Sequence, residues 1–195
     1  MTTLSDALRR IVVALDDAGS NYALVGGLAV ARWAEPRLTR DAAVVVSVSS
    51  DREAESLIRT LGSAGYRAVT LVEEQNVGRL ATVRLADSSD VLTDLLFASS
   101  GVEPEIVEAA VVSEVVPGVV LPVACAGDLI AMKLLSRDDR HRPNDADDLR
   151  SLREVATETD WDRATAMVAL IEKRGYARDR DLATALVTLR RDGAY

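Results

Sequence analysis

The sequence is poor in cysteine, aromatic residues and positive charge, and each shortage excludes a class of protein. Its 195 residues include one cysteine, Cys125, so it can form neither a disulfide framework nor a cysteine-based zinc site. Aromatic residues make up 4% of the chain, so the core must be built mainly from aliphatic side chains. Cys125 follows an apolar run and is interpreted as a small buried hydrophobic residue.

Acidic residues outnumber basic ones. The 31 Asp and Glu against 23 Lys and Arg give a formal net charge of -8, which argues against non-specific coating of nucleic acid. No segment approaches the roughly 20 consecutive apolar residues that a membrane-spanning helix needs. The first residues, MTTLSDALRR, contain no apolar signal region. We therefore expect a cytoplasmic protein whose contacts with nucleic acid, if it has any, are local.

The hydrophobic pattern predicts an α+β fold. Period-2 or continuous apolar runs predict strands at 22–25, 44–48, 67–72, 78–86 and 91–98, and two short strands around Pro117 and Gly118. Helical spacing is found at 4–18, after the glycine pair at 26–27, from 51 to 61, at 103–110 and throughout the chain from 126 onward. Strands that follow one another without a helix, from 67 to 98, should pair antiparallel. We divide the chain into a core of residues 1–122 and a helical region of residues 123–195.

Three features of this pattern should meet at one edge of the sheet. Gly26 and Gly27 end one strand, Asp41 begins the next, and Asp94 lies inside the apolar strand VLTDLLF. A carboxylate in such a strand costs several kcal/mol, on the order of the desolvation penalty of one ion, unless it is paired or binds a metal. Asp41 alone can also be explained as part of a turn before a strand.

These features resemble a nucleotidyltransferase of the DNA polymerase β type, which has a Gly-Gly or Gly-Ser turn, an Asp-x-Asp motif and a third acid on a neighbouring strand. In order along residues 20–152, five phrases resemble the AbiEii or MenT-like toxins of bacterial toxin-antitoxin systems: LVGGLAVARW, PRLTRD followed by VVVSV, TDLLF, DLIAMKLLSR and RPNDADDL. The resemblance implies a nucleotidyltransferase-type mixed β-sheet flanked by helices, followed by a helical C-terminal part.

The resemblance also implies roles for individual residues. Backbone N–H groups at Gly26 and Gly27 would approach a triphosphate, and Asp41 and Asp94 would be catalytic carboxylates that ligate Mg²⁺. Lys133 would be a catalytic and nucleotide-binding residue that directs its ammonium at phosphate. Without the resemblance, Lys133 can equally be a lysine whose stem lies on apolar surface while its charge reaches water.

Two positions bear on how far the motif is preserved. Asp145 and Asp148 match an acidic phrase of these toxins and would contact the nucleotide, although Asn144 replaces its lysine and both acids can also cap a helix. In the T-R-D-x-D pattern the second acid falls at position 43, where this chain has Ala43. Alanine cannot ligate a cation, so the chain is either a degenerate member or an inactivated form of an active enzyme.

The resemblance further implies transfer of a nucleotide from an NTP, CTP or UTP in particular, to the 3′ end of tRNA, which blocks aminoacylation and translation. A basic patch would be needed to hold tRNA. The candidates are Arg137, Arg140 and Arg142, with Arg32, Arg37 and Arg40 as a second group near the glycine turn. Asp138 and Asp139 dilute the first group, so a solvated loop is the alternative. His141, the only histidine, is interpreted as a surface residue.

A toxin of this kind implies an antitoxin partner. In related pairs the antitoxin can phosphorylate a hydroxyl residue beside the first metal acid, and Thr39 occupies that position. A phosphate there adds up to about two negative charges and would repel a triphosphate. Thr39 can also be a hydroxyl that caps a turn.

Two other functions remain open at this point. A small-molecule nucleotidyltransferase, such as one that modifies an antibiotic, would use the same metal motif, and the negative charge of the chain suits a cationic substrate better than tRNA. A non-catalytic binding module would be consistent with Ala43 as it stands.

Overall fold

The computed structural model describes residues 4–35, 39, 41–138 and 144–192, and its centre is a seven-stranded mixed sheet. The strands run in the order β3-β4-β5-β2-β1-β7-β6. Their bounds are Tyr22–Val25 (β1), Ala42–Val46 (β2), Arg67–Glu74 (β3), Arg79–Ala86 (β4), Leu92–Leu96 (β5), Val111–Val116 (β6) and Val119–Val123 (β7). β2 is parallel to β5 and antiparallel to β1, while β3, β4 and β5 form the antiparallel series that the sequence predicts.

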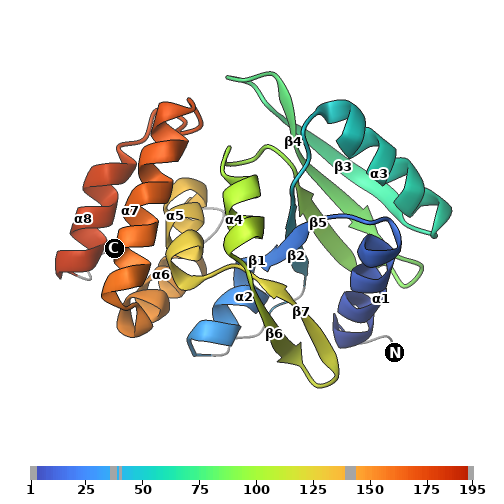
Figure 1. The fold of residues 1–195 in the computed structure, drawn as a ribbon, viewed down its shortest axis with the longest axis horizontal. Coiled ribbons are helices and arrows are strands. Elements are labelled where there is room, and N and C mark those ends of the chain that lie inside the picture. The colour runs from blue at the N-terminus through green and yellow to red at the C-terminus, as the bar shows by residue number, and fades with distance from the viewer. Residues whose placement is uncertain (1–3, 36–38, 40, 139–143, 193–195) are drawn as a thin grey trace.

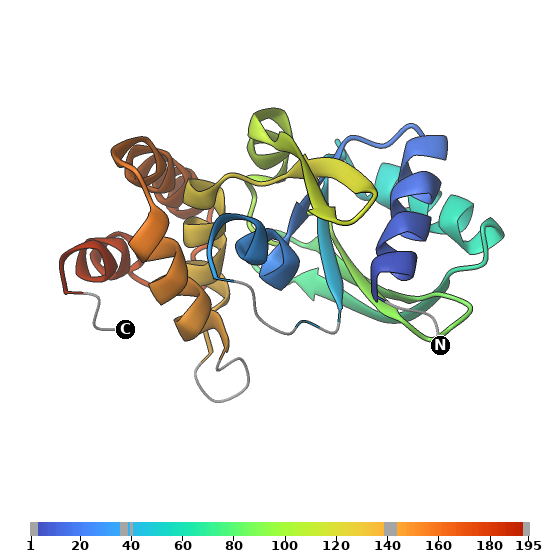
Figure 2. The ribbon, with the colours of Figure 1, turned by 90° about the horizontal axis from the view of Figure 1, so that it is seen from below.

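Helices cover both faces of this sheet (Figures 1 and 2). Their bounds are Leu4–Asp17 (α1), Gly26–Trp33 (α2), Asp51–Ser63 (α3), Glu103–Ala109 (α4), Ala126–Ser136 (α5), Asn144–Val155 (α6), Glu158–Lys173 (α7) and Leu182–Asp192 (α8). α1 and α3 lie on one side, and the C-terminal helices α5 to α8 lie on the other. α2 and α4 contact the central strands β1 and β2. The predicted α+β class is confirmed.

The last strand ends at Val123, and every element that the structure describes beyond it is a helix. The boundary expected at residue 122 therefore falls inside the final residues of β7. α5 packs against α7 and α6, and it also contacts α2, which follows the first strand of the sheet. The division into two domains stays a prediction.

Helical spacing explains why α1 lies on the sheet. Leu8, Ile11 and Leu15 are fully buried and fall on one face of the helix, because residues three or four positions apart are neighbours on a helix surface. α3 begins after Ser50, whose hydroxyl accepts a hydrogen bond from the backbone N–H of Glu53. The hydrophobic spacing in the sequence predicts both helices, whereas the Ser50 cap is seen only in the structure.

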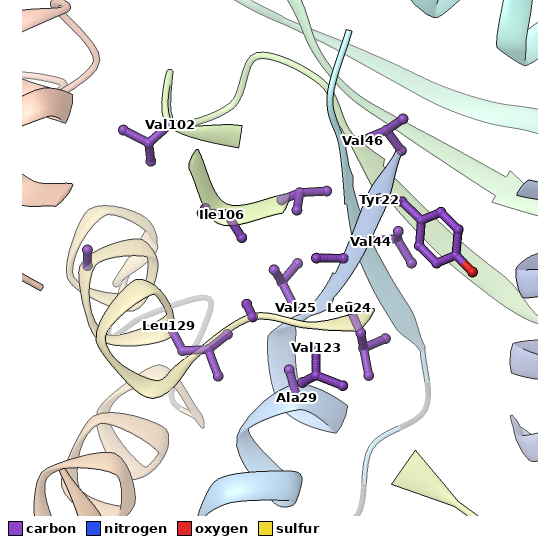
Figure 3. Close-up of a cluster of buried hydrophobic side chains, with 14 of the residues drawn as sticks. Tyr22, Leu24, Val25, Ala29, Val44, Val46, Val102, Ile106, Val123 and Leu129 are labelled. Carbon is purple, nitrogen blue, oxygen red and sulfur yellow. The ribbon is translucent and has the colours of Figure 1, made fainter. Parts of the chain in front are cut away.

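The core lies on both sides of the central strands (Figure 3). All four residues of β1 are buried, because helices cover both of its faces. Leu24 of β1 packs on the side away from Ile106 of α4 and Leu129 of α5, which close the other side. The outer strand β3 is exposed along most of its length. Among the residues that the structure describes, no helix combines the length and apolar character needed to cross a bilayer.

Candidate functional site

The register of four neighbouring strands puts the predicted polar residues on one face of the sheet. Val25 of β1 pairs with Ala43 of β2, Ala43 pairs with Asp94 of β5, and Asp94 pairs with Arg84 of β4. Side chains of directly paired residues point to the same face, and so do residues two positions apart. Asp41 lies just before β2, and its Oδ2 is 3.9 Å from Nη2 of Arg84, so it is close to the same residues. The convergence of the glycine turn with Asp41 and Asp94 is observed in the structure.

Gly26 forms the junction between β1 and α2. Its φ is +70°, a left-handed conformation that L side chains rarely adopt. A Cβ atom added there would lie 3.1 Å from the Cβ of Ala43, so the backbone of Gly26 runs close over β2. Because α2 begins at Gly26 directly after the strand, its first N–H groups lack intrahelical partners. This is the kind of helix N-terminus that binds anionic groups.

Asp94 is held by a guanidinium that the sequence analysis did not identify. Arg84 donates from Nε to Oδ1 and from Nη2 to Oδ2 of Asp94, each at 2.7 Å. The hydrogen bond to Asp94 is the main cause that raises the pKa of Arg84, with further contributions from the charges of Asp94 and Asp41. The carboxylate in the apolar strand is therefore paired, and its presence there no longer requires a metal.

Asp41 lies immediately before β2 and is more exposed. Its side chain is 48% exposed, whereas that of Asp94 is 16% exposed. Nη2 of Arg84 is 3.9 Å from Oδ2 of Asp41, and the same nitrogen contacts Asp94. One guanidinium therefore links both carboxylates and brings them close together.

A cavity of about 270 Å³ opens between this face of the sheet and α5; we call it the cleft. Gly26, Ala43 and Asp94 line its sheet side, and Lys133 and Ser136 line its α5 side. The far end of the cleft is lined by Glu74, Ser99, Ser100 and Arg178. Arg178 bridges that end, since its Nε is 3.0 Å from Glu74 and its Nη2 donates to the carbonyl of Ser99 at 2.6 Å.

Lys133 is a buried member of an ion-pair cluster on α5 and α6. Its Nζ lies 2.5 Å from Oδ1 of Asp145 and 2.7 Å from Oδ2 of Asp148. Ser136 donates to the other oxygen of Asp145 at 3.0 Å. Asp145 and Asp148 are nearly inaccessible and lie behind Lys133, outside the set of residues that line the cleft. The three predicted residues are therefore together, but of the three only Lys133 lines the cleft, and the two acids hold its ammonium.

The structure describes only some of the arginines in the two expected basic groups. Arg32 is exposed on α2 and stacks over Trp33, 5.1 Å from the ring centroid. Arg137 follows α5 and is half-buried, and its carbonyl accepts a hydrogen bond from Arg180. Thr39 is half-buried. Arg37, Arg40, Arg140, His141 and Arg142 lie outside the described residues.

The site contains fewer carboxylates than a two-metal centre uses. Within the described ranges, no group of three or more His, Cys, Asp or Glu is placed to hold a metal ion. Ala43 pairs with both Val25 and Asp94, at the position where the nucleotidyltransferase motif that the sequence resembles has its second acid. Among the described residues, Asp41 and Asp94 are the two carboxylates that Arg84 contacts.

Arg84 and Arg178 are the residues that sequence reasoning missed. The segment GRLATVRLA alternates, so Arg84 could be assigned to the polar face of its strand, but its register against Asp94 depends on how the hairpin turns. Arg178 comes from the turn between α7 and α8 and meets Glu74 over a separation of 104 residues. No feature of the sequence near either residue predicts that Arg178 and Glu74 form an ion pair.

No family model and no curated protein matches this sequence. Solved structures do resemble the fold. An antigenic nucleotidyltransferase-like protein from Paracoccidioides brasiliensis is 20% identical, with a TM-score of 0.50 and coverage of 94% of this chain and 93% of that one. ANT(2″)-Ia in complex with adenylyl-2″-tobramycin is 17% identical, with a TM-score of 0.55 and coverage of 89% and 99%. The chain thus has the fold of nucleotidyltransferases.

Proposed function

We propose that the chain binds a nucleoside triphosphate with Mg²⁺ in the cleft, at a nucleotidyltransferase-type site whose transfer step is impaired by Ala43. The observation that carries the proposal is the strand register, which puts Ala43 between the glycine turn and Asp94, close to Asp41. Phosphate groups would bind the N–H groups at the start of α2, near Gly26 and Gly27. Lys133 lines the cleft and would supply a positive charge to the phosphates.

The carboxylates present are sufficient for one Mg²⁺ that arrives with its nucleotide. Mg²⁺ is commonly held by one or two carboxylates together with substrate phosphates and water. Asp94 lines the cleft and Asp41 lies next to it, because both contact the same guanidinium, so the two carboxylates meet that requirement. When bound, the ion would neutralise phosphate charge and polarise the phosphorus centre. Two Mg²⁺ ions would require a further carboxylate, and position 43 is where the motif that the sequence resembles has one.

Restoring that acid tests the proposal directly. Ala43→Asp should convert the chain into an active enzyme that releases pyrophosphate from an NTP in the presence of Mg²⁺, whereas Ala43→Asn has a similar size and no charge and should not. The assay is transfer of a labelled nucleotide, with each of the four NTPs, to total tRNA and to a panel of small polyamines and aminoglycosides. Equal transfer by the unaltered chain and Ala43→Asp would contradict the impairment, and no nucleotide binding by either would contradict the proposal.

The first candidate acceptor is the 3′ end of tRNA, in keeping with the toxin-like phrases of the sequence. A label from CTP or UTP on tRNA would support this acceptor. The candidate contacts are Arg137, Arg140 and Arg142, and the loss of the last two should reduce the salt slope of tRNA binding by roughly 1 to 2 units without changing nucleotide affinity. Arg32 near the glycine turn is the competing contact, and its loss should weaken both ligands.

The second candidate acceptor is a cationic small molecule, and the charge of the cleft favours it. Glu73, Glu74 and Asp94 line the cleft along with Lys133 and Arg178. Asp94 is paired with Arg84 and Glu74 with Arg178, while Lys133 faces the two acids Asp145 and Asp148, so Glu73 and the Lys133 cluster leave the region with net negative charge. This negative charge attracts a cationic acceptor and disfavours tRNA, whose many phosphates are not accompanied by the Mg²⁺ that would neutralise the triphosphate. Label on an aminoglycoside or polyamine but not on tRNA would select this acceptor, and nucleotide binding without any transfer by Ala43→Asp would indicate a binding module.

For the tRNA acceptor we also propose control by an antitoxin that phosphorylates Thr39. Thr39 lies two residues before Asp41, so a phosphate would add negative charge beside the first carboxylate. The Thr39→Glu variant should lower the affinity for a triphosphate, whereas Thr39→Gln should not. Equal nucleotide affinity for the two variants would contradict this form of control.

A further inference from the structure

We propose that Arg84 competes with Mg²⁺ for the carboxylate of Asp94, so that the ion is held there only after the guanidinium has turned away. The inference rests on the proposed function, because it takes Asp94 to be a ligand of the ion. It assigns to Arg84 the role of a positioning residue that keeps the metal-free site closed.

The contact between the two side chains uses both oxygens of Asp94. The two hydrogen bonds are parallel and 2.7 Å long, the fork geometry in which guanidinium and carboxylate bind most strongly. A Mg²⁺ ligand must direct an oxygen at the ion at roughly 2.1 Å. An ion held by Asp94 would have to share these two oxygens with the guanidinium, and the like charges of ion and guanidinium repel.

Arg84 also reduces the negative charge of the two carboxylates in the absence of an ion. Its Nη2 is 3.9 Å from Oδ2 of Asp41 and 2.7 Å from Oδ2 of Asp94, so one nitrogen contacts both carboxylates that would hold the ion. With Ala43 between the glycine turn and Asp94, one guanidinium faces two acids. The metal-free arrangement is thus a stable ion-pair network, and an incoming cation must break it.

The surroundings give Arg84 space to leave. Its side chain is 41% exposed, and its cross-strand neighbour on β3 is Thr70, which is exposed. Turning away from Asp94 therefore moves the guanidinium into water and not into the core. No change of the backbone is required for this rotation, because arginine has several side-chain rotamers.

The experiment measures Mn²⁺ binding, as a probe for Mg²⁺, by electron paramagnetic resonance of the full chain without nucleotide. Arg84→Gln should bind Mn²⁺ at least about tenfold more tightly than the unaltered chain, because a cation within about 4 Å of the ion is removed. Arg84→Lys keeps the charge and loses the fork, so a smaller gain is expected. The control Arg67→Gln removes the same charge from the exposed pair with Asp90 and should change little.

A second readout needs no variant of Arg84. In the unaltered chain, the Nε–H signal of Arg84 in a nitrogen-15 spectrum should move toward the position of a free arginine as Mg²⁺ is added. An affinity for Mn²⁺ that Arg84→Gln leaves unchanged, or an Arg84 signal that Mg²⁺ leaves in place while Asp94→Asn abolishes binding, would overturn the competition alone. If Asp94→Asn leaves Mn²⁺ binding intact, the metal site of the proposed function fails and the competition fails with it.

Discussion

The ammonium of Lys133 lies 2.7 Å from the carboxylate of Asp148, and both side chains are buried. Asp145, three residues earlier on α6, contacts the same ammonium. Three charged groups are therefore removed from water together, and their mutual pairing offsets the cost of doing so. The cluster ties α5, which forms one wall of the cleft, to α6.

Loss of Lys133 should be strongly destabilising. Lys133→Met leaves two buried carboxylates without their cation and should lower the free energy of unfolding by about 3–5 kcal/mol. The chain has only one other lysine, Lys173, which is exposed on α7, and Lys173→Met should cost less than about 0.5 kcal/mol. Urea unfolding of both variants measures the difference. Similar values would mean that the cluster contributes little to stability.

The sequence predicted the elements well and the pairing of charges poorly. Strand and helix positions follow from hydrophobic periodicity, which is local, and the glycine turn is visible as Gly26 and Gly27 after an apolar run. The partners of Asp94 and Lys133 depend on strand register and on how α5 meets α6, which are set by packing over longer separations. Asp94 is the clearest case, because an apolar strand with one acid indicated a special role but not the Arg84 that pairs with it.

Substitution by alanine should be more destabilising at Gly26 than at Gly19, whose φ is similar. Gly19 has φ +64° with no atom within 4 Å of an added Cβ, so Gly19→Ala should cost about 1–2 kcal/mol for the left-handed conformation alone. Gly26→Ala adds the 3.1 Å contact with Ala43, inside the central sheet, and should cost more and weaken triphosphate binding.

The contact can be separated from the backbone strain by a second substitution. Ala43→Gly removes the Cβ that an added Gly26 side chain would meet, so the Gly26→Ala penalty should be smaller in that background. Urea unfolding of the two single variants and the pair gives the coupling. Additive effects would show that Ala43 does not restrict Gly26.

Cys125 should react slowly with alkylating reagents. Burial, together with the charge of Asp128 and the hydrogen bond to it, raises the pKa of the thiol from 9.0 to about 11. At pH 8 the folded chain should react with iodoacetamide roughly a hundredfold more slowly than the urea-unfolded chain, because the thiolate is the nucleophile. The folded state also keeps the proton longer, so its stability should fall as the pH rises from about 9 toward 11. Equal alkylation rates would contradict the raised pKa.

Substitutions at position 43 and at Arg84 should act together on metal binding, because both positions are paired with Asp94. Ala43→Asp puts a third carboxylate beside Asp94, on the face that Arg84 already occupies. Adding Arg84→Gln leaves three acids without a cation, so the double variant should be the least stable of the four forms without metal. It should also bind Mn²⁺ most tightly, because the ion then meets three carboxylates and no competitor. Its melting temperature should therefore rise most with Mn²⁺, by the equivalent of about 2.7 kcal/mol at a hundred times its Kd, while the unaltered chain responds least.

Differential scanning fluorimetry over a Mn²⁺ series measures this, with Ala43→Asn combined with Arg84→Gln as the control of equal size. A melting temperature of the double variant that is independent of Mn²⁺, while the control behaves identically, would show that these three positions do not form a metal site.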